Sequence, residues 1–127
     1  MAAGLTLDTG ALIAAEKGHR MFWKLWTASL ARDANVTVPA AVLAQAWRGN
    51  SPVIARLLPA CFVEVLHEGT AKRIGNLLAK SGRRADVVDA AVVVGAALRN
   101  DAIVTSDPDD IAHLVDATGL DLRILTV

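Results

Sequence analysis

The sequence predicts an α/β fold with three layers, in which helices cover both faces of a central parallel sheet. Short β-prone stretches alternate with helix-forming stretches along the whole chain, with no internal repeat or linker. Such alternation favours a parallel sheet, because each helix returns the chain to the side of the sheet where the next strand begins. The length of 127 residues and the apolar fraction of 54% indicate one domain with a buried core, spanning residues 1–127.

The first half of the chain is expected to alternate strands with pairs of helices. In order, the predicted elements are a strand at 5–7, helices at 11–17 and 19–32, a strand at 36–38, and helices at 40–48 and 52–58. Gly18 and Asn35 interrupt the helical pattern, and Pro39 suits the first turn of the helix that follows it. Ser51 and Pro52 have the form of an N-cap and a first helical residue.

The second half of the chain continues the alternation. Its predicted strands are at 62–66, 102–104 and 122–127, and its predicted helices are at 69–80, 86–99 and 108–117. Ser81 and Gly82 end the first of these helices. The helix at 86–99 is apolar on all sides, so we expect it to be buried despite its β-branched residues.

Composition excludes several classes of protein. No apolar run reaches the length of about 18 uncharged residues that a membrane span needs, so no contact with a membrane is expected. The N-terminus lacks the basic start and long apolar segment of a signal peptide, which indicates a cytoplasmic location. Cys61 is the single cysteine, which rules out an internal disulfide and a cysteine-based zinc site.

The charge balance argues mildly against a protein that holds nucleic acid by electrostatic attraction alone. Thirteen basic and thirteen acidic residues cancel, and the isoelectric point is near neutral. Proteins that bind nucleic acid mainly through phosphate contacts are usually basic. An enzyme that holds its substrate briefly through a metal ion remains compatible with this balance.

Acidic residues stand at the positions where such a fold places its ligands. Asp8 directly follows the first strand, and Asp107 follows the strand at 102–104, with Asp110 one helical turn later. Asp86 and Asp89 begin the buried helix. Because ligands bind beyond the carboxyl ends of parallel strands, these carboxylates are expected to converge. Mg²⁺ neutralises such clusters, and it supports phosphodiester cleavage by activating water and stabilising the leaving oxygen.

Each aspartate also has a structural interpretation. Asp107 followed by Pro108 is a good helix start, with Asp107 as the N-cap, and Asp86 has the same form. Asp8 is harder to explain in this way, since a carboxylate that ends an apolar strand is costly without a partner. The joint pattern favours a site more than any single member does.

The tripeptide formed by Asp8, Thr9 and Gly10 is also found in aspartic proteases. Those enzymes bring two such loops together, in a fold made of strands. This chain has one copy, followed at once by helix-forming residues, so the protease interpretation is disfavoured. A haloacid-dehalogenase-type phosphatase requires a second aspartate two residues after the first, where this chain has Gly10.

Three stretches resemble, in order and spacing, the motifs of PIN domains, particularly the VapC-type toxins of prokaryotic toxin–antitoxin modules. They are LTLDTGALIAAEKG, VPAAVLAQAWRG and DAAVVVGAALRNDAIVTSDPDDI. The resemblance covers essentially the whole chain. It implies a PIN-like α/β/α fold, a homodimer, endoribonuclease activity that depends on Mg²⁺ or Mn²⁺, an RNA substrate and a cognate antitoxin protein.

The same resemblance assigns roles to the acidic residues. Position by position, it makes Asp8, Asp89 and Asp107 the catalytic residues that hold the metal. Asp110 corresponds to a further metal ligand. Asp86 corresponds either to a helper of the site or to a plain helix cap.

Three polar residues are expected beside the acids. The resemblance implies that Thr105 orients the cluster by hydrogen bonding and that Thr9 does likewise. Gln45 stands where the family usually has a glutamate, which puts either the number of metal ions or the activity in question. Glu16 has no counterpart in the family motifs and is expected to be a solvated helix charge.

The surface of the protein leaves further alternatives open. Arg48, Arg83 and Arg84 are candidates for contacts with RNA phosphates, or they are solvated helix-end and loop residues. The apolar faces of the helix that carries Trp23 and Trp26, and of the helix that carries Trp47, are more simply explained as core than as a dimer or antitoxin groove. A second hypothesis is a PIN-like scaffold that binds RNA or a protein partner without cleaving, favoured by Gln45 and the neutral net charge.

Overall fold

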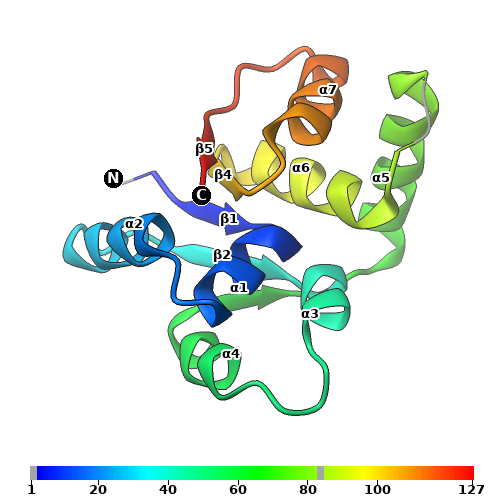
Figure 1. Ribbon diagram of the computed structural model, residues 1–127. Coiled ribbons are helices and arrows are strands. Elements are labelled where there is room, and N and C mark those ends of the chain that lie inside the picture. The colour runs from blue at the N-terminus through cyan, green and yellow to red at the C-terminus, as the bar shows by residue number, and fades with distance from the viewer. Residues whose placement is uncertain (1–2, 83–84) are drawn as a thin grey trace.

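A parallel sheet forms the centre of the molecule in the computed structural model, which describes residues 3–82 and 85–127. Five strands pair within these residues, in the order β3-β2-β1-β4-β5, and all neighbours run parallel (Figure 1). The strands are β1 (Leu5–Leu7), β2 (Val36–Pro39), β3 (Phe62–Glu64), β4 (Ala102–Thr105) and β5 (Ile124–Thr126). The predicted parallel sheet is therefore confirmed.

Helices form a layer on each side of this sheet (Figure 1). One layer contains α1 (Thr9–Glu16), α2 (Arg20–Ala31), α3 (Ala40–Ala46) and α4 (Pro52–Leu57), followed by a short 3₁₀ helix, Leu58–Ala60. The other contains α5 (Glu68–Ser81), α6 (Val87–Arg99) and α7 (Pro108–Thr118). Right-handed connections between parallel strands produce this division, because the chain passes from β2 to β3 at one edge and then crosses back to β4. The predicted three-layer α/β/α fold is confirmed.

The core lies on both faces of the three central strands. All residues of β1, β2 and β4 are buried, as expected for strands that helices cover on both sides. The middle of α6, residues 90–96, is also buried, which confirms the expectation for this helix. Its ends differ from that expectation, since Val87 and Leu98 are more than half exposed. No helix in the described part of the chain is long and apolar enough to cross a membrane.

Aromatic residues of α2 anchor this helix to the core. Phe22 is buried, and its ring lies 5.2 Å from that of Trp23 and 6.2 Å from that of Trp26, centroid to centroid. The indole nitrogen of Trp23 donates a hydrogen bond to the backbone oxygen of Ala15 in α1, at 3.3 Å. These residues therefore serve the packing of α2 against α1, which is the role that the sequence favoured.

Several element boundaries differ from the prediction. Pro39 was expected in the first turn of a helix, but it is the last residue of β2 and pairs with Glu64. Proline lacks a backbone N–H, so it suits the end of a strand as well as a helix start. Helix α3 ends at Ala46, because Trp47 already has an extended backbone. Helix α1 begins at Thr9, two residues early, because Asp8 caps it.

Candidate active site

Asp8 connects the end of β1 to the start of α1. Its carboxylate Oδ1 accepts a hydrogen bond from the backbone nitrogen of Ala11 at 2.8 Å, and only 4% of the residue is exposed. Burial raises the pKa of Asp8, the hydrogen bonds from Thr105 and Ala11 lower it, and the charge of Asp107 raises it. The net shift is upward. Asp8 is therefore a helix cap and, at the same time, a buried carboxylate at the carboxyl end of the sheet.

Thr105 links two of the aspartates. It is the fully buried last residue of β4, the strand that pairs with β1. Its side chain makes a hydrogen bond that lowers the pKa of Asp8, and its hydroxyl oxygen accepts from the backbone nitrogen of Asp107 at 2.9 Å. Thr105 therefore holds the end of β1 and the start of α7 in a fixed relation, as an orienting residue must.

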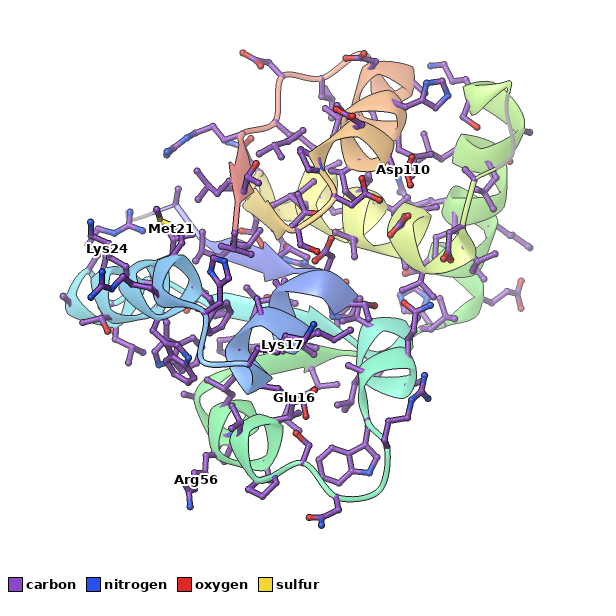
Figure 2. The ribbon with its side chains drawn as sticks, in the orientation of Figure 1. Glu16, Lys17, Met21, Lys24, Arg56 and Asp110 are labelled. Atoms are coloured by element: carbon purple, nitrogen blue, oxygen red, sulfur yellow. The ribbon has the colours of Figure 1, made fainter. Side chains whose placement is uncertain are left out.

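Asp107 occupies the N-cap position of α7. Its side chain makes no cap hydrogen bond of regular geometry. The charge of Asp110, one helical turn later, is the main cause that raises the pKa of Asp107, whereas a hydrogen bond from the backbone of Asp110, in the first turn of the helix, lowers it. Asp107 therefore interacts with the start of α7 and with Asp8 at the same time. Figure 2 shows Asp110 projecting from α7, on the side of the molecule formed by α5, α6 and α7.

Asp89 lies in the first turn of α6 and is partly buried. Burial is the main cause that raises its pKa to about 6. The negative charges of the four other candidate aspartates raise it further; they are Asp86, Asp8, Asp110 and Asp107. The structure thus brings carboxylates from β1, α6 and α7 within electrostatic range of one another. Asp86 itself caps α6, accepting from the backbone nitrogen of Val88 at 2.6 Å, which supports its structural interpretation.

The chemistry of these carboxylates fits a hard divalent cation. Their mutual repulsion raises the pKa of Asp89 and of Asp107. A bound cation would offset the free energy of this repulsion. Within residues 3–82 and 85–127, no three acidic, histidine or cysteine side chains are close enough to enclose an ion directly. Mg²⁺ typically takes one or two carboxylates and keeps several waters, so a looser set of aspartates suits it. The donor set therefore matches Mg²⁺ or Mn²⁺ with part of the coordination supplied by water.

The absence of a side chain at Gly10, which follows Asp8 and Thr9, lets the start of α1 lie close to Ser106. A Cβ atom at this position would collide with the hydroxyl oxygen of Ser106. The first turn of α1 therefore approaches the loop between β4 and α7 more closely than any other residue would allow. This close approach keeps Asp8 and Asp107 near each other.

Thr9 and Gln45 form a pair beside the acids. The Thr9 hydroxyl donates to the Gln45 side-chain oxygen at 2.5 Å, so Thr9 is bonded to α3 and not to an aspartate. Gln45 is thereby held next to the residue that follows Asp8. Arg48 is exposed in the segment after α3. The other two candidates for phosphate contacts, Arg83 and Arg84, lie outside the described residues.

Glu16 has a partner that the sequence did not indicate. It was expected to be a solvated helix charge, but its carboxylate accepts from the Ser51 hydroxyl at 2.5 Å. Figure 2 shows Glu16 on the side of α1 that faces α4. Because Ser51 also caps α4, Glu16 ties the end of α1 to the start of α4. It takes no part in the aspartate cluster.

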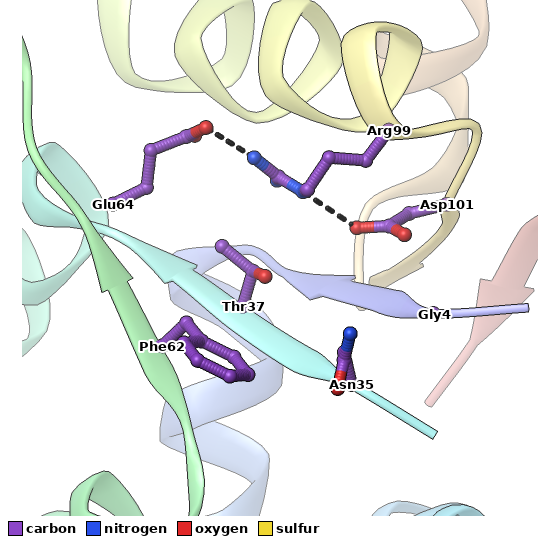
Figure 3. Close-up of a pocket in the computed structure, with 7 residues that line it drawn as sticks. All are labelled: Gly4, Asn35, Thr37, Phe62, Glu64, Arg99 and Asp101. Atoms are coloured by element: carbon purple, nitrogen blue, oxygen red, sulfur yellow. Dashed lines mark hydrogen bonds and ion pairs between the residues drawn. The ribbon is translucent and has the colours of Figure 1, made fainter.

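The sequence did not indicate a second polar network, which surrounds Arg99 and connects the start of β4 with the end of β3. The guanidinium of Arg99 binds Glu64, Asp101 and Thr6, and Asp101 is only 6% exposed (Figure 3). Asp101 directly precedes β4, so the burial argument that singled out Asp8 applied to it equally. Arg99 and Glu64 are 35 positions apart, and no local pattern connects them.

Comparisons with known proteins support the fold. No protein-family model matches this chain, and no curated protein matches it by sequence. Among solved structures, it is similar to a chain of VapBC2 from Rickettsia felis, solved with a DNA fragment from the promoter of these proteins. The TM-score is 0.70 at 14% identity, over 97% of this chain and 98% of that chain.

A second similar structure is PAE2754 from Pyrobaculum aerophilum. Its TM-score is 0.57 at 17% identity, over 94% of this chain and all of that chain (100%). At such low identities the likeness concerns the fold alone. Within that limit, the resemblance to VapC-type PIN domains that the motifs indicated is confirmed: this chain has a PIN-like α/β/α fold.

Proposed function

We propose that this chain is a single-domain, metal-dependent endoribonuclease and the toxin of a toxin–antitoxin module. The observation that carries the proposal is the convergence of three carboxylates: burial and the charge of Asp107 raise the pKa of Asp8, and burial and the charges of both raise the pKa of Asp89. Carboxylates whose pKa is raised by burial and by one another are typical of a catalytic site. The similarity of fold to a chain of VapBC2 from Rickettsia felis supports the toxin assignment, and we propose a cytoplasmic location together with it.

The chemistry of the site follows from its residues. Asp8, Asp89 and Asp107 would hold Mg²⁺ or Mn²⁺, with Asp110 as a further ligand. When bound, such an ion supplies a Lewis acid that activates water and stabilises the leaving oxygen of a phosphodiester. Thr105 keeps Asp8 and Asp107 in register through its two hydrogen bonds. Burial of Asp8 excludes bulk water from one side of the site.

Cleavage of RNA by the purified protein tests this proposal. We expect endonucleolytic products from structured RNA in Mg²⁺ or Mn²⁺, and no products in EDTA. Cleavage that persists in EDTA would reject metal dependence. Binding of RNA without cleavage under every metal condition would favour the alternative, a PIN-like scaffold, for which Gln45 and the neutral net charge are the supporting features.

Gln45→Glu is expected to strengthen metal binding. The amide offers a metal one oxygen without charge, whereas a glutamate adds one negative charge next to Thr9, whose hydroxyl can still donate to it. Affinity for Mn²⁺ should rise by roughly tenfold if the added attraction is worth about 1.4 kcal/mol. Calorimetric titration measures the change. Ala44→Glu, which adds the same charge at the neighbouring exposed position of α3, is the matched control. Equal affinities for both variants would remove Gln45 from the site.

Apolar surface supports two protein partners for the toxin. A groove of about 380 Å³ is lined by Ala40, Leu43, Ala44, Trp47 and Leu58, and we assign it to the antitoxin. A second apolar surface, at and just beyond edge strand β3, exposes Val63, Val65 and Leu66. Exposed apolar patches of this kind mark contacts between proteins. We expect a homodimer by light scattering; a monomer at all concentrations would contradict this.

A further inference from the structure

A cleft of about 540 Å³ opens beside β2 and β3. Gly4, Asn35 and Asp101, which directly precede β1, β2 and β4, form one wall of it. Thr37, Phe62, Glu64 and Arg99 complete the lining (Figure 3). The cleft therefore extends from the amino ends of the central strands to Glu64, the last residue of β3, and shares no residue with the candidate active site.

The charged residues of the cleft leave an excess of negative charge. Glu64 and Asp101 are the two acids in the lining, and Arg99 is bound to both of them. Gly95 allows this arrangement, because a Cβ atom there would collide with the Glu64 carboxylate. With two carboxylates against one guanidinium, the cleft repels phosphate and other anions and attracts cations.

Three oxygen acceptors in the cleft remain open. Glu64 Oε1 and Asp101 Oδ1 accept from none of the residues that the structure describes, since Arg99 and Thr6 use the other oxygens. The Thr37 hydroxyl has no hydrogen bond within those residues either, although only 4% of Thr37 is exposed. Figure 3 shows its side chain projecting from β2 toward Arg99, between Glu64 and Asp101. Within the described residues no fully enclosed side-chain oxygen lacks a partner, so the Thr37 hydroxyl reaches the solvent of the cleft, and a ligand with N–H donors can bind there in place of water.

Phe62 adds an aromatic surface beside these acceptors. It is 62% exposed, and it is the register partner of Thr37 on the neighbouring strand. Organic cations bind to exposed aromatic faces through the negative potential of the ring. The ring also offers apolar contact to an alkyl chain, which a bare metal ion could not use.

We propose that this cleft binds an organic cation, an alkylguanidinium or alkylammonium group. Its N–H groups donate to Glu64, Asp101 and Thr37, and its carbon atoms lie against Phe62. One positive charge neutralises the excess charge of the lining. Two sources share this chemistry, a free small amine and the basic side chain of another protein. The site is independent of RNA cleavage, so it stands or fails separately from the proposed function.

Titration of the ¹⁵N-labelled protein in EDTA tests the proposal. We expect n-butylguanidinium or n-butylammonium to produce saturable shifts of the backbone amides of Gly4, Thr37 and Phe62, at millimolar concentrations. The neutral analogue n-butanol and sodium chloride at equal ionic strength should produce none at these amides. Acetyl-Gly-Arg-Gly-amide distinguishes the sources: the same shifts indicate a protein side chain, and their absence indicates a small free cation. No saturable shift with either butyl cation overturns the proposal, as does equal binding of n-butanol.

Substitutions within the cleft sharpen the test. Thr37→Val keeps the shape of the side chain and should weaken binding about fivefold, the loss of one hydrogen bond, whereas Thr37→Ser should restore it. Phe62→Ala should weaken binding by about two- to fivefold. Val65→Ala removes an equally exposed apolar side chain outside the cleft and should leave affinity unchanged. If Thr37→Val and Phe62→Ala both bind like the wild type, with native spectra, the site does not exist.

Discussion

Asp8→Asn should abolish RNA cleavage without lowering the melting temperature of the metal-free protein. Asparagine caps a helix as well as aspartate does, so the hydrogen bond from Ala11 survives. The substitution also removes a buried carboxylate whose pKa is raised by burial and by the charge of Asp107. The folded state therefore loses the unfavourable free energy of keeping this charge buried and near Asp107. A metal site loses a ligand, and cleavage should fall by about a hundredfold or more. Gel-based cleavage and thermal unfolding in EDTA measure the two effects.

Asp116→Asn is the matched control for this variant. Asp116 is exposed near the end of α7, and the same change of chemistry there should leave both cleavage and melting temperature unaltered. An Asp8→Asn protein that melts much lower and still cleaves RNA would show that Asp8 is structural, and the assignment of the site would fail.

The metal-free protein should lose stability as the pH rises from about 4 to about 6. The pKa of Asp89 is raised to about 6, mainly by burial, so within this window the folded protein holds a proton that the unfolded chain has released. Stability therefore falls with increasing pH across the window and levels off above it. The upward shifts at Asp8 and Asp107 act in the same direction. Between these pH values, Asp89→Asn should reduce the change in the free energy of unfolding by about 1–2 kcal/mol, a figure that allows for the partial exposure of Asp89.

Urea unfolding in EDTA at several pH values measures this dependence. The difference between wild type and Asp89→Asn reports the titration of Asp89 together with its electrostatic effect on Asp8 and Asp107, since distant carboxylates contribute equally to both proteins. Mg²⁺ should stabilise the wild type more at pH 7 than at pH 5, because the ligands must be deprotonated to bind it. Identical pH profiles for the two proteins would show that Asp89 is neither desolvated nor coupled to the other acids.

Much of the fold could be predicted from the sequence, because the patterns that indicate strands, helices and their ends are local. Apolar runs at β1, β2 and β4, and breaks such as Gly18 and Gly82, indicated the element order correctly. The rule that ligands lie beyond the carboxyl ends of strands then placed Asp8 and Asp107 on the same edge. Element ends were less accurate, because capping by Asp8 and the strand pairing of Pro39 depend on neighbours in space.

Other features depend on packing that no local pattern encodes. Asp86 and Asp107 both occupy N-cap positions, but only Asp86 makes a cap hydrogen bond of regular geometry, and the backbone conformations of the two residues differ. The bond between Thr9 and Gln45 requires α1 to lie beside α3. The network around Arg99 joins residues up to 95 positions apart. Of these, only Asp101 carried a signal in the sequence, a carboxylate next to an apolar strand.

Calorimetric titration of Mn²⁺ into the metal-free protein near pH 7 tests the central claim most directly. If the aspartates from β1, α6 and α7 form one cation site, the wild type should bind Mn²⁺ saturably. Asp8→Asn and Asp89→Asn should each bind it at least about tenfold more weakly, because each removes a charged ligand, while Asp116→Asn should match the wild type. No saturable binding to the wild type, or equal affinity in all four proteins, would contradict the account.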